Sequence, residues 1–149
     1  MSYSDKINKD LMKAMLAKEK DRLEALRAVK TAFILARSEK GVDYVLSDAE
    51  ELKILQKLVK QRKESAAIYK EQNRYDLHDK EISEAAFIEA YLPEMMSSSE
   101  LEAYLKQVIQ NAGAEGMKDI GRVMGIATKE LAGKAEGKAI SETVRKLLS

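Results

Sequence analysis

The sequence contains no cysteine and no tryptophan, and it has a single proline and a single histidine. Without cysteine the chain can form no disulfide, no thiolate nucleophile and no thiolate metal site. One histidine cannot supply a histidine-based metal cluster, and a single histidine is weak evidence for a Ser-His-Asp triad. We therefore predict no catalytic residue, no bound metal and no cofactor.

Long apolar runs are also missing, and the segment from Met1 to Lys6 has no apolar signal region. We accordingly expect no membrane partner and a cytoplasmic location. Only 5% of the residues are aromatic and 34% are charged, with Ala, Glu, Lys and Leu abundant. This composition favours helices, because strands use more β-branched and aromatic residues. The sequence predicts an all-α fold.

The spacing of apolar residues predicts seven helices. Ser4 or Asp5 is expected to cap the first helix, and Gly41 to end the second in the left-handed conformation. Ser47 and Glu50 have the spacing of a capping box, which predicts the start of a third helix that ends at Asn73. The buried face of the first helix is predicted to hold Ile7, Leu11, Ala14 and Met15.

A fourth helix is predicted to begin at Asp76 and to stop before Pro93. The segment 93–99 is the clearest linker, so we predict an N-terminal domain of four helices over 1–93 and a second domain of three helices over 94–149. Serines cap the fifth helix, Gly113 ends it, and the last two helices are expected over 117–131 and 138–148.

Arg62 falls on the apolar side of the third helix, between Leu58 and Tyr69. A guanidinium in such a place needs a negative partner. We expect this partner to be a carboxylate of the fourth helix, either Glu81 or Glu84.

Two glycines, Gly121 and Gly125, lie one turn apart inside the predicted sixth helix. A glycine in a helix costs roughly 1 kcal/mol relative to alanine, which suggests that something approaches the backbone there. One reading is that a neighbouring helix packs closely. The other is that a phosphodiester backbone or a partner helix lies along this flank, beside a stripe formed by Lys118, Arg122 and Lys129, with Asp119 and Glu130 on the far side.

The segment from Gly133 to Lys138 resembles a phosphate loop only superficially. The glycines have the wrong separation for G-x-x-x-x-G-K-[ST], and Ala139 replaces the hydroxyl residue. Nucleotide hydrolysis is therefore not expected. The segment is instead expected to end the sixth helix and begin the seventh. The free backbone N–H groups at the start of the seventh helix could bind one phosphate of a larger partner.

Several motifs together resemble the YqeY family: Lys60-Gln61-Arg62, Asp76-Leu77, Tyr91-Leu92-Pro93 and the run from Lys118 to Gly125. The resemblance covers essentially the whole chain. It implies an N-terminal helical domain followed by a small helical domain similar to the tail of GatB, a subunit of the tRNA-dependent amidotransferase. In GatB this tail helps to hold tRNA, whereas the chemistry occurs in other domains and another subunit.

The leading hypothesis is therefore a non-catalytic protein that binds RNA, with tRNA as the expected partner. The predicted phosphate contacts are Lys118, Arg122, Lys129, Lys134 and Lys138. One alternative is an adaptor that binds a protein partner through the Gly121 and Gly125 flank. A further alternative is an accessory component of a carbon–nitrogen ligase with glutamine as amido-N-donor, assembled with amidotransferase subunits.

Overall fold

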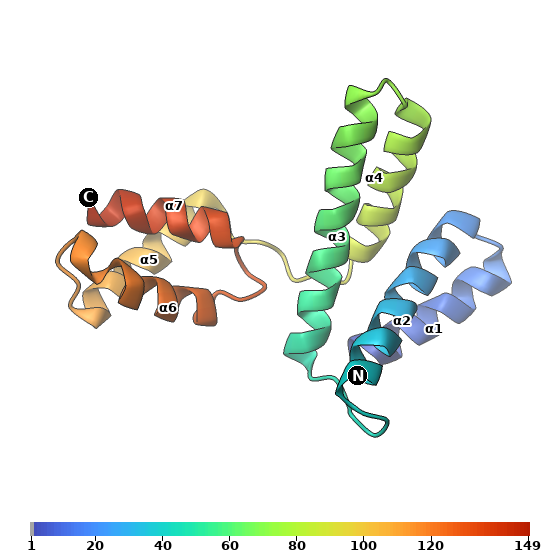
Figure 1. The fold of residues 1–149 in the computed structure, drawn as a ribbon, viewed down its shortest axis with the longest axis horizontal. Helices are drawn as coiled ribbons and strands as arrows, with labels where there is room; N and C mark the ends of the chain where they lie inside the picture. The colour runs from blue at the N-terminus through green and yellow to red at the C-terminus, as the bar shows by residue number, and fades with distance from the viewer. Residues whose placement is uncertain (1) are drawn as a thin grey trace. The chain divides into compact units, whose positions relative to one another are not determined.

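A computed structural model describes residues 2–149, and these residues form helices and connecting turns with no strand. The predicted all-α fold class is confirmed. The chain divides into two compact units, which we call unit 1, Met1–Leu92, and unit 2, Pro93–Ser149 (Figure 1). Each unit has its own hydrophobic core.

Unit 1 consists of four helices, namely α1 (Tyr3–Ala17), α2 (Lys20–Lys40), α3 (Asp48–Glu71) and α4 (Tyr75–Glu89). Helix α1 lies beside α2, and α3 lies beside α4, as two helical hairpins (Figure 1). Contacts between α2 and α4 join the hairpins. Ile7, Leu26, Leu55 and Ile88 are almost fully buried where the helices meet.

The predicted capping box of α3 is confirmed. Ser47 Oγ accepts a hydrogen bond from the backbone N–H of Glu50 at 3.2 Å, and the Glu50 carboxylate accepts one from the N–H of Ser47 at 2.8 Å. For α1 the predicted cap was wrong, because Ser2 caps this helix and Asp5 completes a second capping box. The spacing of Ser2 and Asp5 is the same as that of Ser47 and Glu50.

Two predicted helix boundaries in unit 1 need correction. Gly41 follows α2 with φ 135° and ψ 158°, so it is not in the left-handed helical conformation that we expected. Helix α4 begins at Tyr75, one residue before Asp76, whose carboxylate instead lies in the first turn and pairs with Arg74. Asn73 does adopt a left-handed conformation, with φ 60°, although α3 already ends at Glu71.

The predicted inner face of α1 was partly wrong. Ile7, Leu11 and Ala14 are buried, but Met15 is 53% exposed. Helix α1 packs mainly against α2, with fewer contacts to α3, so its buried stripe is narrow and Met15 falls outside it.

Unit 2 consists of α5 (Ser98–Ala112), a short 3-10 helix η1 (Met117–Asp119), α6 (Ile120–Glu130) and α7 (Gly137–Leu148). The three α-helices pack against one another around Leu105, Val123 and Val144. Ser97 caps α5, and Gly113 ends it in the left-handed conformation at φ 65°, as predicted. The sixth helix is shorter than expected, because residues 117–119 form the 3-10 turn η1.

Candidate nucleic-acid interface

Helix α6 has one face in the core of unit 2. Val123 and Ala127 are fully buried, and Leu131 is buried just after the helix. Projection of the sequence over 117–131 as one helix predicts Met117 on the same face, but Met117 is 47% exposed. It lies in η1, and the helical projection that we applied does not extend through a 3-10 turn.

The glycine flank of α6, formed by Gly121 and Gly125, is open. A Cβ atom built on either glycine would meet no heavy atom within 4 Å beyond the helix's own backbone. The reading in which a neighbouring helix of the same chain packs against these glycines is therefore wrong. The flank is a smooth, solvent-facing strip of backbone that an external partner could approach closely.

Lys118 and Arg122 stand at the N-terminal end of this flank, and both have an acidic partner. Lys118 lies 3.9 Å from Glu115, and an Arg122 Nη atom lies 3.3 Å from Asp119 Oδ1. Asp119 was expected on the far side of the helix, but its carboxylate pairs with Arg122. The same carboxylate accepts the backbone N–H of Glu115 at 3.0 Å, which holds it in place. That backbone hydrogen bond, with the nearby Arg122 and Lys118 charges, keeps the pKa of Asp119 below its usual value.

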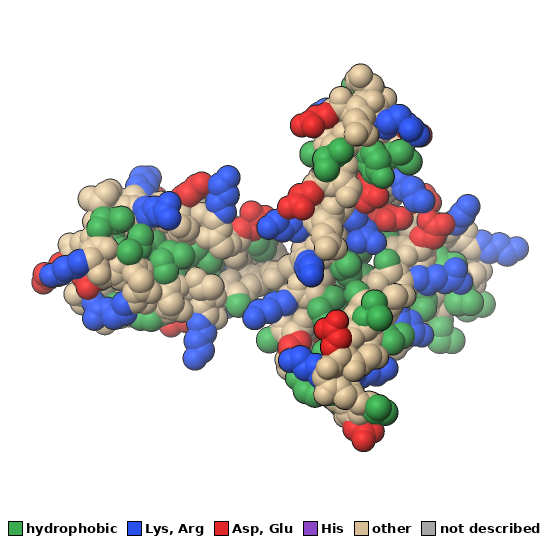
Figure 2. Space-filling view, in the orientation of Figure 1, with side chains coloured by type: hydrophobic (Ala, Val, Ile, Leu, Met, Phe, Trp, Pro, Cys, Tyr) green, Lys and Arg blue, Asp and Glu red, His purple; other side chains and the backbone are tan. Residues whose placement is uncertain are grey.

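The other three predicted cations, Lys129, Lys134 and Lys138, are exposed and form no ion pair within residues 2–149. They come from the end of α6, the following turn and the start of α7. The positive side chains of unit 2 are spread over its visible surface, with hydrophobic side chains between them (Figure 2). The structure thus separates two partnered cations at one end of the flank from three unpartnered ones at the other.

The turn between α6 and α7 is tightly bonded. The N–H groups of Lys134 and Ala135 both donate to the carbonyl of Leu131, while the Lys134 carbonyl accepts the N–H of Met96 at 2.9 Å. Gly133 is buried in this turn at φ 83°, a conformation that favours glycine. Both the N–H and the carbonyl of Lys134 are therefore hydrogen-bonded, which fixes the backbone at this residue.

Glu130 lies beside Lys129 at the end of α6 and reduces the local positive charge. Its carboxylate accepts a hydrogen bond from the Tyr104 hydroxyl at 2.6 Å. This bond, together with burial and the Glu130 charge, raises the pKa of Tyr104. Tyr104 thereby draws the carboxylate toward α5.

Two acidic side chains of α4 have a partner nearby. Glu84 pairs with Arg62, and His78 contacts Asp79 through Nδ1 at 3.0 Å. Within residues 2–149 no group of three or more His, Asp or Glu side chains is arranged to hold a metal ion. In the same part of the chain no helix is long and apolar enough to cross a bilayer.

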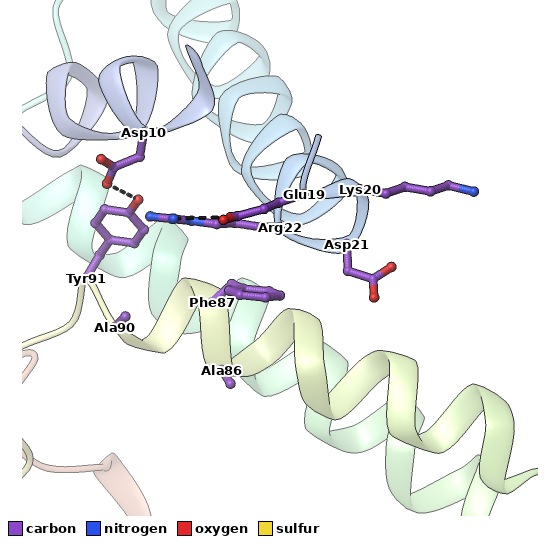
Figure 3. Close-up of a pocket in the computed structure, with 9 residues that line it drawn as sticks. All are labelled: Asp10, Glu19, Lys20, Asp21, Arg22, Ala86, Phe87, Ala90 and Tyr91. Atoms are coloured by element: carbon purple, nitrogen blue, oxygen red, sulfur yellow. Dashed lines mark hydrogen bonds and ion pairs between the residues drawn. The ribbon is translucent and has the colours of Figure 1, made fainter. Parts of the chain in front are cut away.

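Unit 1 contains a hollow that the sequence did not reveal, between the α1–α2 corner and the end of α4 (Figure 3). There the Tyr91 hydroxyl donates a hydrogen bond to Asp10, and Arg22 pairs with Glu19 at 3.4 Å. Burial and the Asp10 carboxylate raise the pKa of Tyr91 to about 12. Tyr91 and Asp10 are 81 positions apart, so no local pattern could predict their contact.

A second hollow of unit 1 lies where α1 begins, beside the C-terminal half of α2 and the start of α3. Glu51 is buried at its wall and accepts the backbone N–H of Ser4 at 2.8 Å. Phe33 and Leu46 line the same hollow. The Glu51 carboxylate thus accepts one of the free backbone N–H groups at the start of α1, that of Ser4.

These features describe a helical protein with two separate cores and a solvent-open, partly basic flank on the second. The chain belongs to the YqeY family, because the family model described as Yqey-like protein matches residues 4–148. This confirms the resemblance that the motifs indicated.

Relatives of the chain include three fungal proteins named "Altered inheritance of mitochondria protein 41, mitochondrial". The protein of Vanderwaltozyma polyspora is 32% identical over 124 residues, covering 76% of this chain and 64% of the relative. For Pyrenophora tritici-repentis the identity is 25%, over 96% of this chain and 79% of the relative. The protein of Lachancea thermotolerans is 34% identical over 68% of this chain and 55% of its own length.

The match therefore spans less than two thirds of the length of the Vanderwaltozyma and Lachancea proteins. All three relatives are named as mitochondrial, so they lend no support to the cytoplasmic location that we expected.

Proposed function

We propose that this chain is a non-catalytic RNA-binding protein that holds tRNA through unit 2. The observation that carries this proposal is the open glycine flank of α6 with unpartnered cations at its C-terminal end. Membership of the YqeY family and the resemblance of the tail to that of GatB support tRNA as the RNA. The proposed contacts are Lys118, Arg122, Lys129, Lys134 and Lys138.

A phosphodiester backbone can approach Gly121 and Gly125 because no Cβ or neighbouring helix occupies the space beside them. Lys129, Lys134 and Lys138 can neutralise phosphates without breaking an ion pair, and each phosphate neutralised releases condensed counterions. Lys118 and Arg122 must first exchange an acidic partner for phosphate. Their ion pairs are exposed, and such pairs contribute only about 0–1 kcal/mol, so the exchange costs little.

Filter binding of tRNA to the full chain at increasing salt concentrations tests this proposal. Affinity should fall steeply between low and physiological salt. The negative slope of log affinity against log salt should become shallower by roughly 0.7–0.9 for each phosphate contact removed. The variant K129Q/K134Q/K138Q should lose about two to three units of this slope, and K118Q/R122Q should lose less.

The matched control is K53Q/K57Q, which neutralises two exposed lysines of α3 in unit 1. It should leave both affinity and slope unchanged. The site assignment is refuted by a triple variant that binds like the unsubstituted chain. The function itself is refuted if tRNA does not bind at low salt.

A second candidate is a protein-interaction adaptor, and the apolar surroundings of the flank favour it. Met117 is exposed and Met124 is half-buried, so a partner helix could place its apolar side chains there. Affinity purification separates the two functions. A stoichiometric protein that survives nuclease treatment, and that is lost with G121Q but kept with K129Q/K134Q/K138Q, indicates an adaptor.

The third candidate, an accessory component of a carbon–nitrogen ligase with glutamine as amido-N-donor, rests on family association alone. It predicts co-purification with an amidase subunit and glutaminase activity in the assembled complex.

For location we keep the cytoplasm as a prediction. Fractionation of cells that carry the chain would decide between the cytoplasm and an organelle such as that named for the relatives.

A further inference from the structure

Helix α1 has a second apolar face that points away from the core of unit 1. Met12, Met15 and Leu16 are 66%, 53% and 84% exposed. Their spacing of three and four residues puts them on one side of the helix. We call these three residues the outer strip of α1.

Lysines border the outer strip. Lys9 and Lys13 are one turn apart on the helix edge next to it, and Lys18 follows at the end of the helix in a left-handed conformation with φ 59°. None of the three forms an ion pair within residues 2–149. The one acidic residue between positions 8 and 17 is Asp10, which turns the other way and accepts the Tyr91 hydroxyl (Figure 3).

The outer strip lies outside the hollows described for unit 1, since neither of them includes Met12, Met15 or Leu16. Three side chains are also few for the centre of a standard protein interface, which buries about 800 Å² on each partner. A bilayer surface requires no complementary groove, and it accepts a short apolar strip flanked by cations.

We propose that the outer strip of α1 binds the surface of an anionic phospholipid bilayer. Met12, Met15 and Leu16 enter the boundary between headgroups and acyl chains, while Lys9, Lys13 and Lys18 contact the lipid phosphates. This revises our expectation of no membrane partner. That expectation rested on the lack of a long apolar run, which is needed to span a bilayer and not to bind at its surface.

Flotation of the full chain with vesicles tests the proposal. The chain should bind vesicles that contain phosphatidylglycerol at low salt and bind much less to phosphatidylcholine alone. L16S and M12S should reduce the bound fraction, and K9Q/K13Q should weaken binding about fivefold for each lysine neutralised.

Two matched controls come from α3 of the same unit. K53Q/K57Q removes two exposed lysines with the same spacing, and I68S removes an exposed apolar side chain. Both should bind vesicles like the unsubstituted chain. Equal binding by L16S and the unsubstituted chain overturns the proposal, and so does an absence of vesicle binding, which would point to a protein partner instead. The tRNA assay involves unit 2, so its outcome is separate.

Discussion

Arg62 Nε donates a hydrogen bond to Glu84 Oε2 at 3.2 Å, and the two side chains are only 15% and 13% exposed. Arg62 also donates through an Nη atom to the carbonyl of Leu58. The pair joins α3 to α4 beside the core of unit 1. It confirms the predicted carboxylate partner of Arg62 and selects Glu84 over Glu81.

Charge reversal at Arg62 should therefore destabilise unit 1. In R62E the Glu84 carboxylate loses its cation and faces a second negative charge in a largely buried place, which costs about 3 kcal/mol or more. The control is K63E, which breaks the exposed pair between Lys63 and Glu89 and should cost at most about 1 kcal/mol. Urea denaturation followed by circular dichroism measures both, and equal midpoints for the two variants would contradict this prediction.

Gly121 and Gly125 should tolerate alanine in the free protein. Each has room for a Cβ, so G121A or G125A should stabilise unit 2 by up to about 1 kcal/mol through helix propensity. G133A should instead destabilise it by roughly 1–2 kcal/mol, because Gly133 has φ 83°. Thermal melts compare the three variants. Reduced tRNA binding by the two stabilised variants would show that a ligand uses the glycine flank.

Lowering the pH should weaken the start of α3. The Ser47 backbone N–H, the Tyr44 hydroxyl and Lys40 all bond to Glu50 and lower its pKa from 4.5 to about 2. The stabilisation is thus present above the unfolded pKa and is lost as the pH falls from about 4.5 to about 2. Urea midpoints across this range should fall more steeply for the unsubstituted chain than for E50Q, with E39Q on α2 as the exposed control. Parallel curves for all three chains would refute the assignment.

Glu51 should show the opposite pH dependence. Burial raises its pKa above 4.5, so the folded state binds the proton more tightly than the unfolded chain. Stability therefore falls as the pH rises from the unfolded pKa of Glu51 to its higher folded pKa. E51Q keeps an acceptor for the Ser4 N–H without the buried charge, so it should be more stable than the unsubstituted chain near about pH 7. The difference should shrink below about pH 4.5. An E51Q chain that is less stable at neutral pH would show that the charge itself stabilises α1.

Local patterns in the sequence predicted much of the fold. The Ser47–Glu50 capping box and the left-handed Gly113 follow from interactions within a few residues, and apolar spacing places Val123 and Ala127 on one helix face. The predictions for Met15 and Met117 failed because helical periodicity does not tell which side a neighbouring helix covers, or where a 3-10 turn interrupts the helix.

By itself the sequence determined the all-α class, the family and the absence of thiol chemistry, since composition, apolar spacing and motifs are properties of the chain alone. Only the tertiary structure decided that Gly121 and Gly125 are open, that Lys118 and Arg122 have acidic partners, and that the outer strip of α1 faces solvent. Each of these facts depends on which other atoms lie within a few ångströms, and that proximity arises when the helices pack.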